Sequence, residues 1–278
     1  MTTLFNRKYS IQIGGIDVTH LDCKFSIKRH LRRSANECTL EVSNLKRGSI
    51  QKLERAEEIF IKIEAGYVDD QGLTLLFKGS TKKGIQVRAD GQGHTVTVTA
   101  KDGRRINNNT IRRSYDKQTS LQKVLEDLAE AMGVGTGNLS NFKNDALTAT
   151  NTKNFPEGYV ASGKAWVKFD SIVRRMGLRW SVQNGNIFLI KQKRTKFVAA
   201  NLLNSNTGLL GSPSKDKVGK VNCTVLIQPG VEPGKLVKLE SKFIEGTYEI
   251  QETRYEGETW GTNSKWDANL VLKPLRSS

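Results

Sequence analysis

Alternation of apolar and polar residues with a period of two constrains this 278-residue chain more than any other feature. Cys23, Phe25 and Ile27 alternate with polar residues, and a second run alternates in the same way from Cys38 to Val42. A strand places successive side chains on opposite faces, so the pattern predicts antiparallel strands with one buried face. So many short strands predict barrels or sandwiches, because closing a sheet removes its exposed edges.

The middle of the chain carries helical periodicity instead. In "TSLQKVLEDLAEAMG", starting at Thr119, apolar residues recur at helical spacing along one face. Thr119 with Gln122 forms a capping-box pattern, and Gly133 suits the C-terminal end. A shorter helix is predicted near "WVKFDSIVRRMG", followed by a hairpin whose turn is Asn184-Gly185.

This change of pattern predicts a mainly β protein with an α+β insert. The predicted domains are a first β domain at 1–105, an α+β domain at 106–197 and a second β domain at 198–278. The stretch "TGLLGSPSKDKVGKV" at 207–221 resembles a phosphate loop but lacks Gly-Lys-Ser/Thr and a following helix. We therefore interpret it as a turn-rich connector between folded units.

Composition narrows the class of protein further. Charged residues make up 26% of the chain and hydrophobic residues 37%, as in soluble globular proteins. No apolar run is long enough for a membrane span, and the first residues lack the layout of a secretion signal. The three cysteines fall at apolar positions of strand-like runs, which predicts buried free thiols and a reducing site of synthesis.

The net charge is +16, from 44 basic and 28 acidic residues. Such a surplus favours nucleic acid or an acidic protein surface as a neighbour. The basic residues concentrate in two stretches, "IKRHLRR" and "GRRINNNTIRR". These stretches contain the candidate partner-facing or DNA-facing residues: Lys28, Arg29, Arg32, Arg33, Arg104, Arg105, Arg112 and Arg113. The same pattern also fits an ordinary exposed basic face or a subunit contact.

No motif for catalysis or metal binding stands out. The set His20, Cys23, His30 and Cys38 has metal-ligand chemistry, but Cys23 and His30 point to opposite faces of one predicted strand. There is no Gly-x-Ser-x-Gly elbow to supply a nucleophile. We therefore name no catalytic residue and expect no cofactor and no metal, while a glycosidase carboxylate pair from distant positions stays open.

Several stretches together resemble bacteriophage baseplate hub proteins related to the late-control protein D group. "VSNL", "IFIKIEAGYVDD", "LTLLFKGSTKKGI" and "HTVTVTAKDG" resemble their first domain. "TSLQKVLEDLAEAMG" and the unit after it are similar to their middle domain. "NTGLLGSP", "PGKLVKLES" and "GTYEIQETRYEGETWG" resemble their last domain. The resemblance is collinear over nearly the whole chain.

The resemblance implies two tail-tube-like β-barrel domains flanking a small α+β domain, with a structural role and no enzymatic activity. It implies a homotrimeric ring that adapts a sixfold tail tube to a threefold spike and lets DNA pass. The implied partners are the tail tube protein, a separate central spike protein, other baseplate proteins and genomic DNA in the lumen.

The implied location is the tail baseplate of the virion, after synthesis in the host cytoplasm. Two alternatives remain at this point: a basic nucleic-acid-binding module, and a cell-wall hydrolase component of the tail.

Overall fold

The structure is a computed structural model that describes residues 6–68, 72–91, 93–103, 106, 108–139, 154–191, 200–261 and 264–275. Contacts divide the chain into two compact units. Unit 1 comprises 1–30, 36–101 and 195–278, and unit 2 comprises 31–35 and 102–194. The contacts thus place both predicted β domains in one unit; we call them the first β region (1–105) and the second β region (198–278). The division into three domains stays a prediction.

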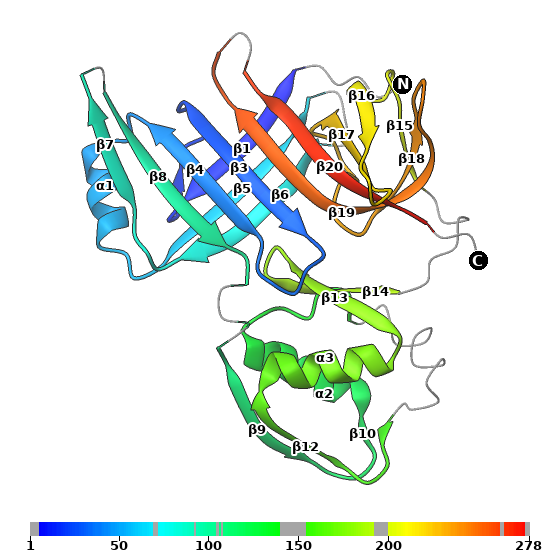
Figure 1. The fold of residues 1–278 in the computed structure, drawn as a ribbon. Coiled ribbons are helices and arrows are strands. Elements are labelled where there is room, and N and C mark those ends of the chain that lie inside the picture. The colour runs from blue at the N-terminus through cyan, green and yellow to red at the C-terminus, as the bar shows by residue number, and fades with distance from the viewer. Residues whose placement is uncertain are drawn as a thin grey trace. The chain divides into compact units, whose positions relative to one another are not determined.

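Unit 1 consists almost entirely of strands, and the predicted mainly β class is confirmed (Figure 1). From the first β region it takes β1 (Arg7–Ile13), β2 (Ile16–Asp17), β3 (Cys23–His30), β4 (Glu37–Ser43), β5 (Ile59–Tyr67), β6 (Gly72–Thr81), β7 (Gln86–Asp90) and β8 (Gly93–Lys101), with helix α1 (Arg47–Glu54). From the second it takes β15 (Asn201–Leu203), β16 (Leu209–Lys215), β17 (Val221–Leu226), β18 (Leu236–Glu240), β19 (Glu245–Glu258) and β20 (Trp266–Pro274).

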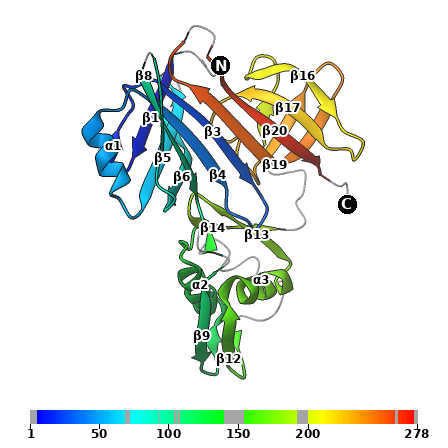
Figure 2. The same cartoon turned by 60° about the vertical axis from the view of Figure 1, so that its left-hand side comes forward.

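These strands form one 14-stranded sheet. Its main path runs β16-β17-β20-β19-β3-β4-β8-β6-β5-β1-β2, with β7, β15 and β18 paired beside it. The two β regions meet where β19 pairs antiparallel with β3 (Figure 2). The expectation of closed barrels is wrong for the described residues, in which no barrel closes. The reason is topological: β3 pairs its outer edge with β19 instead of with β1 or β2.

The buried face of this sheet belongs to a single hydrophobic cluster. It contains residues of both β regions, such as Ile27 and Leu40 from the first and Tyr255 and Leu270 from the second. The predicted burial of the three free cysteines is confirmed. Desolvation raises the pKa of the Cys23 thiol to about 12, so it stays a protonated apolar side chain at neutral pH.

The stretch interpreted as a connector belongs to this sheet as well. Residues 209–215 form strand β16, which pairs with β17 through an irregularity between Leu210 and Ser214. The carboxylate of Asp216 accepts the backbone N–H groups of Val218 and Lys220 and thereby closes the turn into β17. The connector interpretation is therefore wrong, because glycine and proline here mark a bulged edge strand.

Unit 2 packs two helices between short two-stranded sheets (Figure 1). The helices are α2 (Leu121–Met132) and α3 (Ala165–Arg175). The strands are β9 (Thr110–Tyr115) with β12 (Tyr159–Lys164), β10 (Thr119–Ser120) with β11 (Asn154–Phe155), and β13 (Leu178–Gln183) with β14 (Asn186–Lys191). No helix in the described residues is long and apolar enough to cross a bilayer.

Helix α2 begins one residue later than its sequence signal indicates. Ser120, not Thr119, is the N-cap residue, and its side chain accepts the backbone N–H of Lys123 at 3.2 Å. The Thr119 hydroxyl instead donates to the carbonyl of Asp116, because Thr119 still belongs to β10. The predicted end is confirmed, since Gly133 adopts the left-handed conformation.

The Asn184-Gly185 hairpin turn is confirmed. Both residues have positive φ, 54° and 78°, as a two-residue turn between twisted strands requires. The buried carboxylate of Asp102 accepts the backbone N–H of Asn184 at 2.9 Å and holds the turn.

Candidate functional site

The strongest structural feature of unit 1 is the seam between β3 and β19, which joins strands from opposite ends of the sequence. Residues 252–258 of β19 pair with residues 24–30 of β3. The start of β19 pairs through residues 245–249 with β18 on the same edge. A register shift between Ile250 and Glu252 in the β19–β20 pairing marks the point where the edge passes from one partner to the other.

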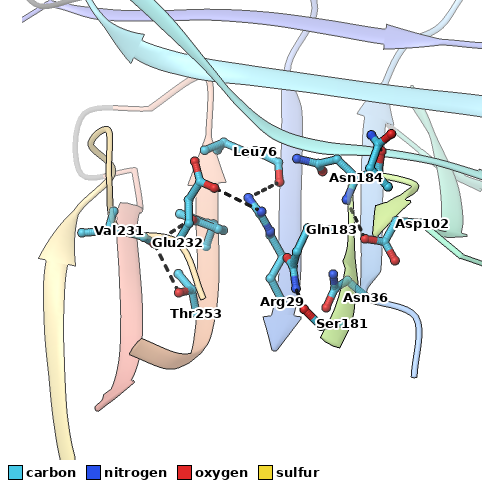
Figure 3. Close-up of polar contacts among 12 residues, drawn as sticks. Arg29, Asn36, Leu76, Asp102, Ser181, Gln183, Asn184, Val231, Glu232 and Thr253 are labelled. Carbon is cyan, nitrogen blue, oxygen red and sulfur yellow. Dashed lines mark hydrogen bonds and ion pairs between the residues drawn. The ribbon is translucent and has the colours of Figure 1, made fainter. Parts of the chain in front are cut away.

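Arg29 lies on the buried side of this seam, directly opposite Thr253 (Figure 3). It is only 1% exposed. One terminal nitrogen of its guanidinium donates to the carbonyl of Leu76 at 3.2 Å, and the other contacts a carboxylate oxygen of Glu232 at 3.4 Å. Arg29 and Leu76 come from the first β region and Glu232 from the second, so this buried cation ties the regions together.

Two further polar groups complete the buried seam. The hydroxyls of Thr253 and Tyr255 both donate to the carbonyl of Val231, at 3.2 and 2.7 Å. Burial raises the pKa of the Tyr255 phenol, and the nearby Arg29 partly offsets the increase. The phenol therefore stays protonated and keeps its hydrogen bond at any physiological pH.

The opposite face of the seam strands is polar and almost charge-balanced. Counting the outward positions of β3, β4, β8, β20 and residues 252–258 of β19 gives five cations and six carboxylates, a net charge of −1. The cations are Lys24, Lys28, Lys101, Arg254 and Lys273, and the carboxylates are Glu37, Glu41, Glu252, Glu256, Glu258 and Asp267.

Ion pairs neutralise most of the cations on this face. Lys24 lies 3.4 Å from Glu258 and Lys28 lies 3.2 Å from Glu252, both across the seam. Further pairs on this face are Lys101–Glu37 at 3.3 Å and Arg254–Glu256 at 3.2 Å, and Lys265 also contacts Glu256 at 3.0 Å. Exposed pairs of this kind contribute little to stability, but they leave few unbalanced cations to attract an anion.

In unit 2, four arginines gather around one cavity. Arg32 and Arg33 come from the 31–35 segment, Arg174 from α3 and Arg179 from β13. Asp170 on α3 is the single carboxylate in the lining. Arg174 and Arg179 are absent from the predicted basic set, because that set covers only the stretches "IKRHLRR" and "GRRINNNTIRR".

The eight predicted basic residues do not form one patch. Lys28 and Arg29 point to opposite faces of β3, and Arg29 is buried. Arg104 and Arg105 lie outside the described residues. Arg32 and Arg33 line the cavity of unit 2. The proposed role of these residues in facing a partner or DNA stays a prediction.

The last two predicted residues, Arg112 and Arg113, are exposed on β9 of unit 2. Arg113 pairs at 3.0 Å with Asp127, a buried carboxylate of α2 that Lys123 also contacts at 2.8 Å. Burial raises the pKa of the adjacent Tyr115 phenol to about 12, and the negative charge of Asp127 contributes to the increase. Arg113 therefore serves the packing of β9 on α2, whereas the Arg112 side chain lies on the solvent side.

Metal chemistry finds no support in the described part of the chain. No group of three or more histidine, cysteine, aspartate or glutamate residues lies close enough there to hold a metal ion. Cys23 and Cys38 are buried in the core of unit 1, and the backbone N–H of His30 donates to the side chain of Asn36.

The fold is that of phage tail proteins. The structure resembles a tail protein from Neisseria meningitidis MC58, with a TM-score of 0.62, 10% identity and 97% of each chain covered. It also resembles the 43 kDa tail protein of prophage MuSo2 from Shewanella oneidensis, with a TM-score of 0.64, 9% identity and again 97% of each chain. Likeness at this level of identity concerns the fold alone.

The family itself follows from the sequence. The model of the family described as "Baseplate hub gp41" matches residues 10–263, and the chain belongs to that family. The resemblance to baseplate hub proteins is thereby confirmed.

A component of the type VI secretion system of E. coli, described as similar to the T4 tail proteins gp27 and gp5, shares the fold. Its TM-score is 0.51 at 8% identity, covering 96% of this chain and 77% of that one. A search of curated proteins finds no match.

Proposed function

We propose that three copies of this chain form a ring in the baseplate, as a structural and non-enzymatic hub of a phage tail. In this ring the two β regions of each chain act as two similar modules, so that three chains present six modules to the tail tube. The lower side of the ring then meets a threefold spike, and DNA passes through the lumen. The protein would be made in the host cytoplasm and assembled there into the virion tail.

The β3–β19 seam is the observation that carries this proposal. It makes one chain supply two β regions to one continuous sheet, with a shared core beneath. A protomer whose sheet contains two β regions suits this role, because three such protomers present six β regions. The ring is then threefold in its chains and nearly sixfold in its β regions, so it can join a sixfold tube to a threefold spike. Membership in the baseplate hub family supports the same arrangement.

The ends of the sheet support ring closure. Strand β16 ends the path on one side, and in the described residues its second edge has no strand partner. On the other side β2 covers only Gln12 and Ile13 of β1. Exposed strand edges present unpaired N–H and C=O groups that favour pairing with another chain. Head-to-tail contact between the β16 end of one protomer and the β1 end of the next would satisfy both edges.

Electron microscopy of the purified protein tests this proposal directly. We expect threefold rings with the mass of three 31.0 kDa chains, formed alone or on addition of the spike protein. In such a ring, six β regions surround a central opening. A protein that stays monomeric at high concentration with the spike protein present would contradict the proposal, as would a ring of another symmetry.

The charge-balanced face of the seam strands suits a surface past which DNA slides. Its net charge of −1 contrasts with the +16 of the whole chain. Sequence-independent DNA binding grows with the number of cations that neutralise phosphates. Cations already paired with carboxylates offer little such binding, so this face would not retard DNA in transit.

Removal of the carboxylates should make this face bind DNA. In the triple variant Glu252→Gln, Glu256→Gln and Glu258→Gln, the cations Lys24, Lys28 and Arg254 lose their partners. We expect the affinity for a short labelled duplex to rise about tenfold at low salt, measured by fluorescence anisotropy, and the increase to disappear at high salt.

A triple variant with the same change of charge elsewhere is the control. Glu54→Gln, Glu57→Gln and Glu157→Gln alter exposed carboxylates outside this face. An equal rise in affinity in both triple variants would show that only net charge matters. That result would remove the argument for this face as the lining of the lumen and leave ring formation untouched.

A further inference from the structure

The arginine cavity of unit 2 is the strongest candidate for a binding site of its own. Its volume is about 390 Å³, and its lining comes from three separate segments of unit 2. The walls combine charged and apolar side chains: Leu31, Arg32, Arg33, Asp170, Arg174, Leu178, Arg179 and Trp180. The lining thus contains four guanidinium groups and one carboxylate.

The net charge of unit 2 as a whole also favours an anionic ligand. Unit 2 contains 18 basic and 8 acidic residues, a net +10, whereas unit 1 contains 26 and 20, a net +6. The two units cover the whole chain, and the sum reproduces the net charge of +16. Most of the basic surplus therefore lies in the smaller unit, where it would attract an anionic partner.

Asp170 orients two of the four guanidinium groups. Its carboxylate is 14% exposed and lies 3.0 Å from the Nε atoms of both Arg33 and Arg174. The indole N–H of Trp180 donates to the same carboxylate at 3.0 Å and helps to hold it in place. Both arginines use Nε for this contact. A guanidinium carries five N–H donors, of which Nε supplies only one. Pairs of such donors bind a carboxylate in a bidentate manner.

We propose that this cavity binds an acidic segment of a neighbouring tail protein through one or two carboxylate side chains. A cavity of this size accommodates a few side chains, and Leu31 and Leu178 offer an apolar wall for an aliphatic residue beside the carboxylate. A DNA duplex instead requires cations spread along its length, not converging on one point. The proposal does not depend on ring formation.

Fluorescence polarisation with the full-length protein tests the site. The probe is a labelled Leu-Glu-Asp-Leu peptide, with the neutral Leu-Gln-Asn-Leu peptide and a labelled DNA duplex as separate arms. We expect saturable binding of the acidic peptide only, and binding about tenfold weaker in Arg174→Gln. Arg175→Gln is the matched control, because it removes the same charge one position along α3 and outside the cavity. It should change the affinity less than about twofold.

Three results would overturn the proposal. The first is the absence of saturable binding of the acidic peptide to the wild-type protein. The second is an equal loss of affinity in Arg174→Gln and Arg175→Gln, which would indicate a general positive field. The third is duplex binding that depends on Arg174 without peptide binding, which would make nucleic acid the occupant. Should Arg174→Gln fold poorly by circular dichroism, Arg33→Gln takes its place, because Trp180 and Arg174 still hold Asp170 in that variant.

Discussion

Replacing Arg29 with alanine is expected to lower the free energy of unfolding by about 3 kcal/mol. The substitution removes a side chain that is 2% exposed and contacts both β regions. It leaves the carbonyl of Leu76 without this donor and the carboxylate of Glu232 without its cation. Since Glu232 is 31% exposed, water compensates part of the loss, which places the effect at the low end for a broken buried pair.

Lys28→Ala is the matched control for this prediction. Lys28 precedes Arg29 on β3 and also pairs across the seam, but its side chain is 51% exposed. We expect a loss below about 1 kcal/mol, because exposed ion pairs contribute little. Urea unfolding followed by circular dichroism at the β-sheet minimum compares the two variants. Equal stabilities for both would show that the buried contact of Arg29 does not hold the seam.

Replacing Gly257 with valine is expected to destabilise the same seam by about 2–3 kcal/mol. Gly257 on β19 is the register partner of both Phe25 on β3 and Trp266 on β20. Because Gly257 has no side chain, the two aromatic rings meet over it, with centroids 5.7 Å apart. A Cβ atom at this position would lie 2.1 Å from the Phe25 ring and would force it to move.

A double-mutant cycle identifies the cause of this loss. Phe25→Ala alone should destabilise the protein, because it removes a buried ring. In the Phe25→Ala, Gly257→Val double variant, the valine occupies space that the ring has left. The combined loss should therefore fall at least about 1 kcal/mol short of the sum of the single losses, as expected for residues in contact. Additive losses would show that crowding against Phe25 is not the mechanism.

The strands and helices of this protein could be predicted largely from local pattern. Cys23, Phe25 and Ile27 alternate with polar residues because β3 buries one face, and the apolar stripe of α2 marks its packing side. Pairing between distant strands has no such local signal. Nothing in the sequence near His30 indicates that β3 pairs with residues 252–258, and the prediction of closed barrels failed at this point.

The candidate sites were predictable only in part, for a similar reason. Runs of arginine drew attention to Arg29, but a charge run does not reveal that one member is buried against Glu232. The cavity of unit 2 combines Arg33 with Arg174 and Arg179, which lie in a distant part of the sequence. Convergence of like charges from separate segments becomes visible only in three dimensions.

The seam also bears on how the chain folds during synthesis. The backbone N–H of Cys23 donates to the hydroxyl of Thr259 across 236 positions, so β3 emerges from the ribosome long before its partner. At typical elongation rates the N-terminal strands wait for tens of seconds with an open edge, which is a template for aggregation. A nascent chain stalled before residue 245 would lack β19 altogether, and it should depend on chaperones far more than the released protein does.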